Sequence, residues 1–223
     1  MIESSVEWRV FQIPEIIPRL SSVLRLMGVP EHAREREGEK LKEIHEEAVE
    51  LFISLARPRG AFRLCNPGKE KEELFFDSFE SPILERFLEA DFAAVFLVTL
   101  GAGPEEKAAE LMSQGEYLLA SILDSMASEG AENMARKMQK DVEQRFKIPA
   151  CVRFSPGYGS WSLDCQRFLL PSLQAREHGV SLTESLMMVP RKSISGVILP
   201  KQEKKVDSLC KLCQLSTCSH PGK

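Results

Sequence analysis

The most apolar short run of the chain, FAAVFLVTL over residues 92–100, constrains the fold more than any other stretch. Its length and its content of β-branched and aromatic side chains favour a buried strand over a helix. Gly101 and Gly103 follow, and Pro104 with two glutamates behind it marks the start of a helix. The run therefore predicts a buried strand that leads through a glycine turn into a helix.

The turn itself, TLGAGPEE over residues 99–106, permits two interpretations. Free amides and the helix dipole at such a joint can hold an anion. However, the stretch lacks a full dinucleotide-binding fingerprint, and no acidic residue ends a second strand at the right distance. The other interpretation is a plain strand–turn–helix connection, which is a common joint.

The remaining pattern alternates irregularly between helical and extended segments. This irregular order, with a hairpin near the end, predicts an α+β fold: a mixed, largely antiparallel twisted sheet flanked by helices. We expect a single domain over residues 1–199 and a polar tail over 200–223. The expected helices are 14–28, 31–57, 82–90, 113–146 and 162–178 (kinked or stopped at Pro171), the expected strands are 61–65, part of 73–84, 150–154, 181–189 and 193–199, and 66–73 is expected to be a polar turn.

Composition narrows the functional classes. The 223 residues carry a net charge of −4 and are 43% hydrophobic, which fits one soluble domain of ordinary size. The charge argues against a nucleic-acid partner, and no apolar run is long enough to cross a membrane. The N-terminal segment lacks the pattern of a signal peptide, so we expect a cytoplasmic protein with reduced cysteines.

The loop RFSPGYGSW over residues 153–161 is the strongest candidate for a ligand contact. Pro156 fixes its own backbone, and Gly157 permits a positive φ or a close approach to a ligand. Arg153 offers a planar fork of donors suited to a carboxylate, and Tyr158 offers a flat face and a hydroxyl. From the residues alone, a proline–glycine turn and a ligand-binding loop are both open interpretations.

Three blocks in order extend this loop into a wider resemblance. RFSPGY (153–158), GVSLTES (179–185) and MVPRKSISG (188–196) resemble the activation domain of cobalamin-dependent methionine synthase. The glycine turn at 99–101 and the long helix after it also fit, and the resemblance covers most of residues 20–199. It implies that the chain binds S-adenosylmethionine, whose methyl group reactivates oxidised cobalamin after one-electron reduction.

The resemblance also assigns roles to residues of the loop. It implies that Arg153 holds the carboxylate of the methionine part and that the backbone around Ser155, Pro156 and Gly157 lines the pocket. Tyr158 would lie beside the ligand or the corrin face, which makes it the residue nearest the reaction.

On the long helix, the acidic contact of the family aligns nearest Ser128, which is not acidic. Glu129 and Glu132 are the neighbouring carboxylates that remain for the ligand's ammonium group.

Departures from the full-length enzyme indicate a separate subunit. The loop continues as Gly159-Ser-Trp-Ser-Leu-Asp164, without the histidine segment of the full-length enzyme and similar to stand-alone members of the family. No Asp-x-His-x-x-Gly stretch is present, so we expect cobalamin on a partner, the cobalamin-binding methionine synthase subunit. An electron donor such as flavodoxin completes the expected system. The chain would act in methionine biosynthesis as part of a methyltransferase, and only together with its partner.

The C-terminal tail, CKLCQLSTCSHPGK, carries a separate signal. Cys210 and Cys213 form a C-x-x-C pair, with Cys218 and His220 close behind. This spacing suits zinc, and three thiolates can also hold an iron–sulfur cluster. A terminal tail with free thiols is the alternative.

Two further hypotheses belong to other classes. One is a reactivation protein for another corrinoid methyltransferase, redox-active through the tail. The other is a non-catalytic docking module that keeps the fold without the ligand, for which the missing acid at Ser128 is the cue.

Overall fold

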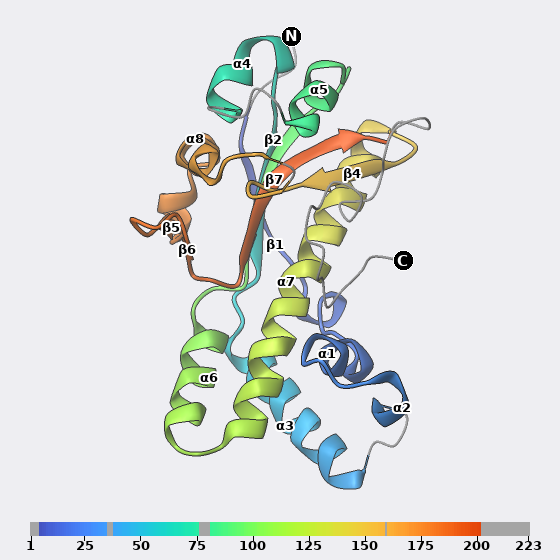
Figure 1. Ribbon diagram of the computed structural model, residues 1–223, viewed down its shortest axis with the longest axis vertical. Coiled ribbons are helices and arrows are strands. Elements are labelled where there is room, and N and C mark those ends of the chain that lie inside the picture. Colours follow the sequence, from blue (N-terminus) through green and yellow to red (C-terminus); the bar gives the residue numbers. More distant parts are fainter. Residues whose placement is uncertain (1–4, 35–37, 76–80, 159, 202–223) are drawn as a thin grey trace.

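The main sheet has five strands in the order β1–β2–β3–β7–β4, and every neighbouring pair in it is antiparallel. The computed structural model describes residues 5–34, 38–75, 81–158 and 160–201. The last strand of the described residues, β7, is thus inserted between β3 and β4 (Figure 1). The predicted α+β fold with a largely antiparallel sheet is confirmed. The strands are β1 (Glu7–Val10), β2 (Arg59–Leu64), β3 (Ala94–Thr99), β4 (Cys151–Phe154) and β7 (Ser193–Pro200).

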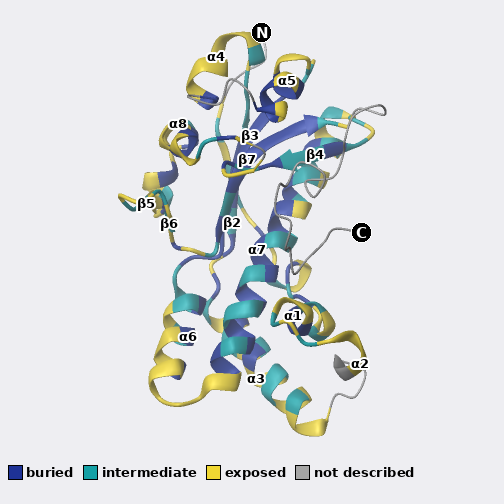
Figure 2. Ribbon diagram, viewed as in Figure 1, coloured by how far each residue is buried: buried dark blue, intermediate teal, exposed yellow. Residues whose placement is uncertain are grey.

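The predicted central strand is β3, and all six of its residues are buried. Phe96 and Val98 point into a core shared with α1 (Leu20–Leu26), α3 (Glu39–Leu55) and α7 (Tyr117–Phe146). Val95 and Leu97 point into a second core on the opposite face. The sheet is therefore a middle layer between two helical layers, which explains why every position of β3 is buried and all but Thr99 are apolar (Figure 2). The second core is covered by α4 (Pro67–Leu74), α5 (Pro82–Leu88) and α8 (Gln166–Ser172).

The long helix α7 connects the sheet to a helical end of the molecule. There it packs against α3 and α6 (Gly103–Ser113), while its other half lies along the sheet (Figure 1). Short elements complete the chain: α2 (Glu31–Arg34) and the 3₁₀ turns at Ile13–Glu15, Leu163–Cys165 and Ala175–His178. Among the described residues, no helix combines the length and apolar character needed to span a membrane.

Two predicted helix boundaries near the N-terminus were wrong. The helix expected over 14–28 begins only at Leu20, beyond Pro18, and a short 3₁₀ turn precedes it. The helix expected over 31–57 is divided into α2 and α3, and Gly38 is the N-cap of α3.

The polar turn expected over 66–73 is in fact helix α4. The Asn66 side chain accepts a hydrogen bond from the Gly68 amide at 3.0 Å, and Pro67 occupies the first helical position. Asparagine before proline thus caps a helix here, although the same letters also favour a turn. The strand expected within 73–84 is wrong for its described beginning, because residues 73–75 end α4; residues 76–80 lie outside the description.

The segment 181–189 is a small hairpin and not one strand. β5 (Ser181–Leu182) pairs with β6 (Met188–Val189), and the Thr183 hydroxyl accepts a hydrogen bond from the Met187 amide at 3.0 Å to close the turn. β7 belongs to the main sheet, so the turn before it joins two sheets. The early stop at Pro171 is confirmed, because α8 ends at Ser172.

Candidate functional site

The loop after β4 is a tight proline–glycine turn. The Tyr158 amide donates to the Ser155 carbonyl at 3.3 Å, with Pro156 second and Gly157, at φ +95°, third in the turn. A positive φ at the third residue is the requirement of a type II turn, which glycine meets without steric cost. The sequence therefore folds locally as a turn, and the turn raises Tyr158, 42% exposed, to the surface.

Trp161 anchors this turn to the core. Its side chain is 1% exposed, its Nε1 donates to the Leu74 carbonyl at 2.7 Å, and its ring stacks on Phe75 with 4.9 Å between centroids. The Gly157 amide donates to the Trp161 carbonyl at 2.6 Å, which ties the turn to its anchor. Trp161 thus attaches the turn to the core, and Tyr158 is exposed at the surface of the turn.

Gly196 allows the end of β4 to lie directly against β7. A Cβ at this position would overlap the carbonyl oxygen of Phe154, the last residue of β4. The backbone of β4 therefore passes against β7 at a distance that only glycine permits. From this point the chain leaves the sheet and enters the turn.

A cavity of about 390 Å³ lies between the loop, α7, α8, the β5–β6 hairpin and β7. This volume falls within the range of small-molecule sites. The walls combine the turn with apolar side chains and a few polar ones. The lining residues are Glu132, Ser155, Pro156, Tyr158, Leu163, Gln166, Leu186, Met187, Met188, Arg191, Ser193, Ile194 and Ser195.

The floor of the cavity contains a stretch of β7 that no described strand pairs with on the β4 side. β4 pairs with β7 only from Val197 onward, whereas β3 pairs with β7 from Ser193 onward. The Leu100 amide donates to the Lys192 carbonyl, which fixes the alternation: the backbones of Ser193 and Ser195 point away from β3. Their amides and carbonyls therefore face the side that β4 has left.

Arg153 and Glu132 form the charged end of the site. The Arg153 Nη2 lies 3.4 Å from the Glu132 carboxylate, and Nε donates to the Gln139 side chain at 3.1 Å. Arg153 is 18% exposed and Glu132 47% exposed. Burial lowers the pKa of the Arg153 guanidinium from its ordinary value, and the Glu132 charge acts in the opposite direction. The pair is thus partly desolvated and balanced in charge.

The two glutamates named as candidates for an ammonium contact lie in different surroundings. Glu132 lines the cavity, but Glu129 is buried and accepts a hydrogen bond from Arg136 at 2.7 Å, with Arg25 at 3.9 Å. The structure therefore brings Glu132, and not Glu129, together with Arg153.

Ser128 also lies outside the cavity lining. Its hydroxyl accepts a hydrogen bond from the Lys192 ammonium at 2.8 Å, and the same ammonium pairs with Asp124 at 2.8 Å. At the position where the resemblance suggested an acidic ligand contact, the Ser128 side chain therefore binds Lys192 of the chain itself.

Sequence reasoning missed part of the cavity wall. Gln166, Arg191 and the methionines Met187 and Met188 all line it. The signal for Met188 and Arg191 was present, because 188–196 was one of the blocks that carried the resemblance, whereas Met187 lies just outside the blocks. Gln166 had no signal beyond its place at the start of a helix.

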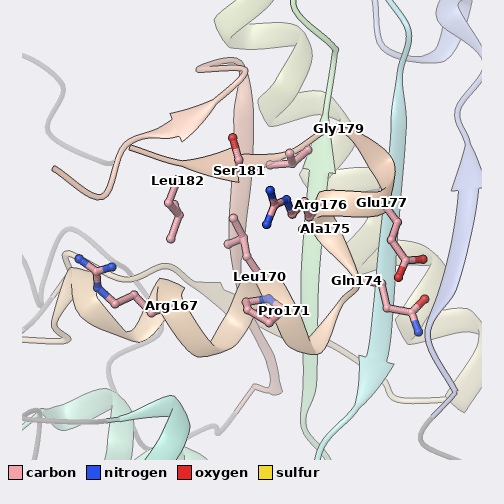
Figure 3. Close-up of a pocket in the computed structure, with 11 residues that line it drawn as sticks. Arg167, Leu170, Pro171, Gln174, Ala175, Arg176, Glu177, Gly179, Ser181 and Leu182 are labelled. Carbon is pink, nitrogen blue, oxygen red and sulfur yellow. The ribbon is translucent and has the colours of Figure 1, made fainter. Parts of the chain in front are cut away.

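A larger cavity, about 890 Å³, lies between α8, the 3₁₀ turn Ala175–His178 and β5 (Figure 3). Arg176, Leu170 and Pro171 are among its lining residues, and Gln174 and Glu177 lie at one end of it. None of the residues predicted from the sequence lines it. We place the candidate site at the smaller cavity, because the loop, Glu132 and the open stretch of β7 line it; Arg153 does not line it but pairs with Glu132 at its margin.

The glycine turn at 99–106 supports the plain-connection interpretation. A Cβ on Gly103 would overlap the Leu55 carbonyl, so the start of α6 is packed against α3. Glu105 in the first turn accepts a hydrogen bond from the Arg191 amide at 2.9 Å. The chain's own groups thus occupy this helix start.

The cysteines divide into two groups. Cys151 and Cys165 are buried and Cys65 is half-buried, and none of the three is in a disulfide, as expected of small core residues. Cys210, Cys213 and Cys218 lie outside the described residues, so the tail remains a prediction. Within the described part of the chain, no group of histidine, cysteine and acidic side chains is arranged to hold a metal ion.

Both the sequence and the fold of this chain are similar to those of known proteins. The family model described as "Vitamin B12 dependent methionine synthase, activation domain" matches residues 82–214. A solved structure described as the MetH reactivation domain bound to AdoHcy is similar in fold, with a TM-score of 0.67 at 16% sequence identity. The similarity covers 92% of this chain and 81% of that one. A comparison with curated proteins finds no match.

Proposed function

The chain belongs to the family of the vitamin B12-dependent methionine synthase activation domain, and from this premise we propose that it binds S-adenosylmethionine in the loop cavity. There it presents the methyl group to a cobalamin carried by a separate partner protein. The solved structure of similar fold is of a domain bound to AdoHcy, the demethylated form of this ligand. The proposed binding domain comprises residues 1–199, with 200–223 as an attached tail.

The observation that carries the proposal is the Arg153–Glu132 pair beside the cavity. An α-amino acid is a zwitterion, so its carboxylate can take the Arg153 guanidinium while its ammonium takes the Glu132 carboxylate. Such an exchange replaces one ion pair by two charge-assisted contacts and leaves no charge unpaired. The pair beside the cavity therefore fits the methionine end of the ligand.

The open sheet edge fits the rest of an extended ligand. Ser193 and Ser195 present backbone donors and acceptors, and Leu163, Leu186 and Ile194 supply apolar walls. Ser155, Pro156 and Gly157 hold the roof of the site in one conformation through their turn. A backbone held in this way loses little flexibility when a ligand binds.

In the proposed reaction, one electron from a donor such as flavodoxin would reduce the oxidised cobalamin of the partner, and the reduced cobalamin would take the sulfonium methyl group and leave S-adenosylhomocysteine in the cavity. This chain contributes position and exclusion of water. Tyr158 stands exposed at the mouth, with Leu163 and Met187 beside it as exposed apolar neighbours. These three side chains form the surface that the partner would cover. The chain would therefore act only as part of the methyltransferase assembly.

The docking-module alternative predicts a site filled by the protein's own side chains. The 390 Å³ cavity beside Tyr158 argues against that, although Arg153 is engaged by Gln139 and Glu132.

Calorimetry with S-adenosylmethionine and S-adenosylhomocysteine is the direct test. Saturable one-to-one binding is expected, and a protein that is folded but binds neither ligand, with or without its corrinoid partner, would refute the proposal.

A further inference from the structure

We propose that Gln166 is the residue that selects adenine in this site, through a hydrogen bond from the adenine 6-amino group to its Oε1 atom. This inference rests on the proposed function, because it assumes that the ligand contains adenosine. It assigns a specificity role to a residue that neither the sequence motifs nor the charged pair includes.

The starting observation is an unmet acceptor. Gln166 is 5% exposed and lines the cavity, and its Nε2 donates to the Leu186 carbonyl at 3.2 Å. This contact fixes which end of the amide is the oxygen, since a carbonyl can receive only the NH₂ end. The Oε1 atom is buried, and among the described residues it has no hydrogen-bond partner. A buried acceptor without a partner is unfavourable, and native proteins seldom retain one without a reason.

The place of Gln166 selects which part of the ligand it meets. Glu132 lies on α7 and Gln166 on α8, and these helices stand on opposite sides of β7 (Figure 1). With the amino-acid end of the ligand at Glu132 and Arg153, the adenosine end extends toward α8. Gln166 therefore faces the nucleoside and not the charged end.

The surroundings of Gln166 favour the base over the ribose. The cavity wall contributed by Leu163, Leu186 and Met188 is apolar, which suits a flat aromatic ring more than a hydroxylated sugar. The edge of adenine carries one exocyclic donor, the 6-amino group, which matches a single acceptor. A 6-oxopurine would instead place an oxygen against Oε1 and be rejected.

Access requires a small movement. Because Oε1 is closed off from solvent in the ligand-free protein, a lining side chain must shift for the base to reach it. Met187 and Met188 stand in this wall, and methionine side chains rearrange readily.

The test combines a variant with a ligand analogue. Gln166→Met keeps the shape and removes the acceptor, and we expect it to weaken binding of S-adenosylhomocysteine by about three- to tenfold, the usual effect of one neutral hydrogen bond. An analogue with hydrogen in place of the 6-amino group should bind the unchanged protein more weakly by a similar factor. The variant should bind the two ligands equally well, since the interaction is already lost. Gln174→Met, on the exposed segment that lines the other cavity, is the matched control and should leave both affinities unchanged.

The outcomes separate the two proposals. If the unchanged protein binds S-adenosylhomocysteine but shows no preference over the analogue lacking the amino group, Gln166 does not select adenine, while the proposed function stands. The same conclusion follows if a folded Gln166→Met binds within twofold of the unchanged protein. If the unchanged protein binds neither ligand, the proposed function itself fails. Should the variant not fold, the comparison of the two ligands on the unchanged protein still decides the matter.

Discussion

Gly196 lies so close to the carbonyl oxygen of Phe154 that any side chain at position 196 would overlap it. This contact between neighbouring strands determines where β4 ends and where the ligand loop begins. The position of the loop therefore depends on a glycine in a distant segment of the chain.

Gly196→Ala is expected to lower the free energy of unfolding by about 2–3 kcal/mol, the cost of overpacking a rigid backbone contact. Urea denaturation followed by circular dichroism measures this change. Gly38→Ala is the control, because position 38 has an ordinary φ and no atom within 4 Å of its would-be Cβ; its effect should stay below about 1 kcal/mol, the scale of a change at an N-cap. Equal stability of the two variants would contradict the close approach.

Trp161→Phe should destabilise the protein by about 1–3 kcal/mol, because it leaves the buried Leu74 carbonyl without its donor. We also expect weaker ligand binding, since the turn that carries Tyr158 loses its anchor. Thermal unfolding and calorimetry report the two effects. Tyr117→Phe, on a largely exposed ring, should alter neither. Binding that is unaffected in a destabilised Trp161→Phe would separate the anchor from the site.

Arg153→Ala is expected to weaken binding of S-adenosylmethionine by about 1.5–3 kcal/mol, the usual contribution of a hydrogen bond to a charged group. Arg167→Ala removes an exposed guanidinium outside the cavity and should change the affinity little. Calorimetry on both variants gives the comparison, and an affinity for Arg153→Ala equal to that of Arg167→Ala would remove Arg153 from the site.

Glu132 and Glu129 provide a second matched pair. Glu132→Gln should weaken ligand binding by about 1 kcal/mol, a modest effect because the carboxylate is half-exposed. Glu129→Gln should reduce stability instead, because the buried carboxylate accepts from Arg136, and binding should not change. The reverse pattern would show that the ammonium group is held at the other glutamate.

Alkylation of Cys65 and Cys151 should depend on whether the protein is folded. Burial raises the pKa of Cys65 and of Cys151 to about 12, so at pH 8 only about one thiol in 10⁴ is the reactive thiolate. Iodoacetamide at pH 8 should leave both unmodified in the folded protein, and unfolding in denaturant should return their pKa to the usual range and allow alkylation.

The same mass-spectrometric measurement tests the tail. If Cys210, Cys213 and Cys218 bind zinc, added zinc should protect them and a chelator should restore their alkylation. Tail cysteines that react equally with and without zinc would argue for free thiols.

The sequence predicted the sheet, its central strand and the long helix, because a run such as 92–100 has one favourable environment. It failed where one pattern has two outcomes, as with Asn66 and Pro67, which cap a helix and also favour a turn. The pattern of segment 181–189 predicts one strand, whereas the pairing of β5 with β6 and the Thr183–Met187 hydrogen bond show that it is a hairpin.

The choice between Glu129 and Glu132 was open for a different reason. Much of α7 is buried, so periodicity does not reveal which face looks toward the ligand loop. Spacing offered one clue, since Glu132 is four residues beyond Ser128 and shares its face of the helix. Gln166 was beyond prediction, because an acceptor without a partner is visible only once its surroundings are known.

The short gap in the sheet at Ser193–Ser195 also bears on how the protein behaves in a crowded solution. An open sheet edge is a template on which another chain can add a strand, and long open edges promote aggregation. Here the open stretch ends where β4 begins to pair, and the turn with Pro156 hangs over it. The same gap that is long enough for a small ligand is thus too short and too sheltered to recruit a foreign strand.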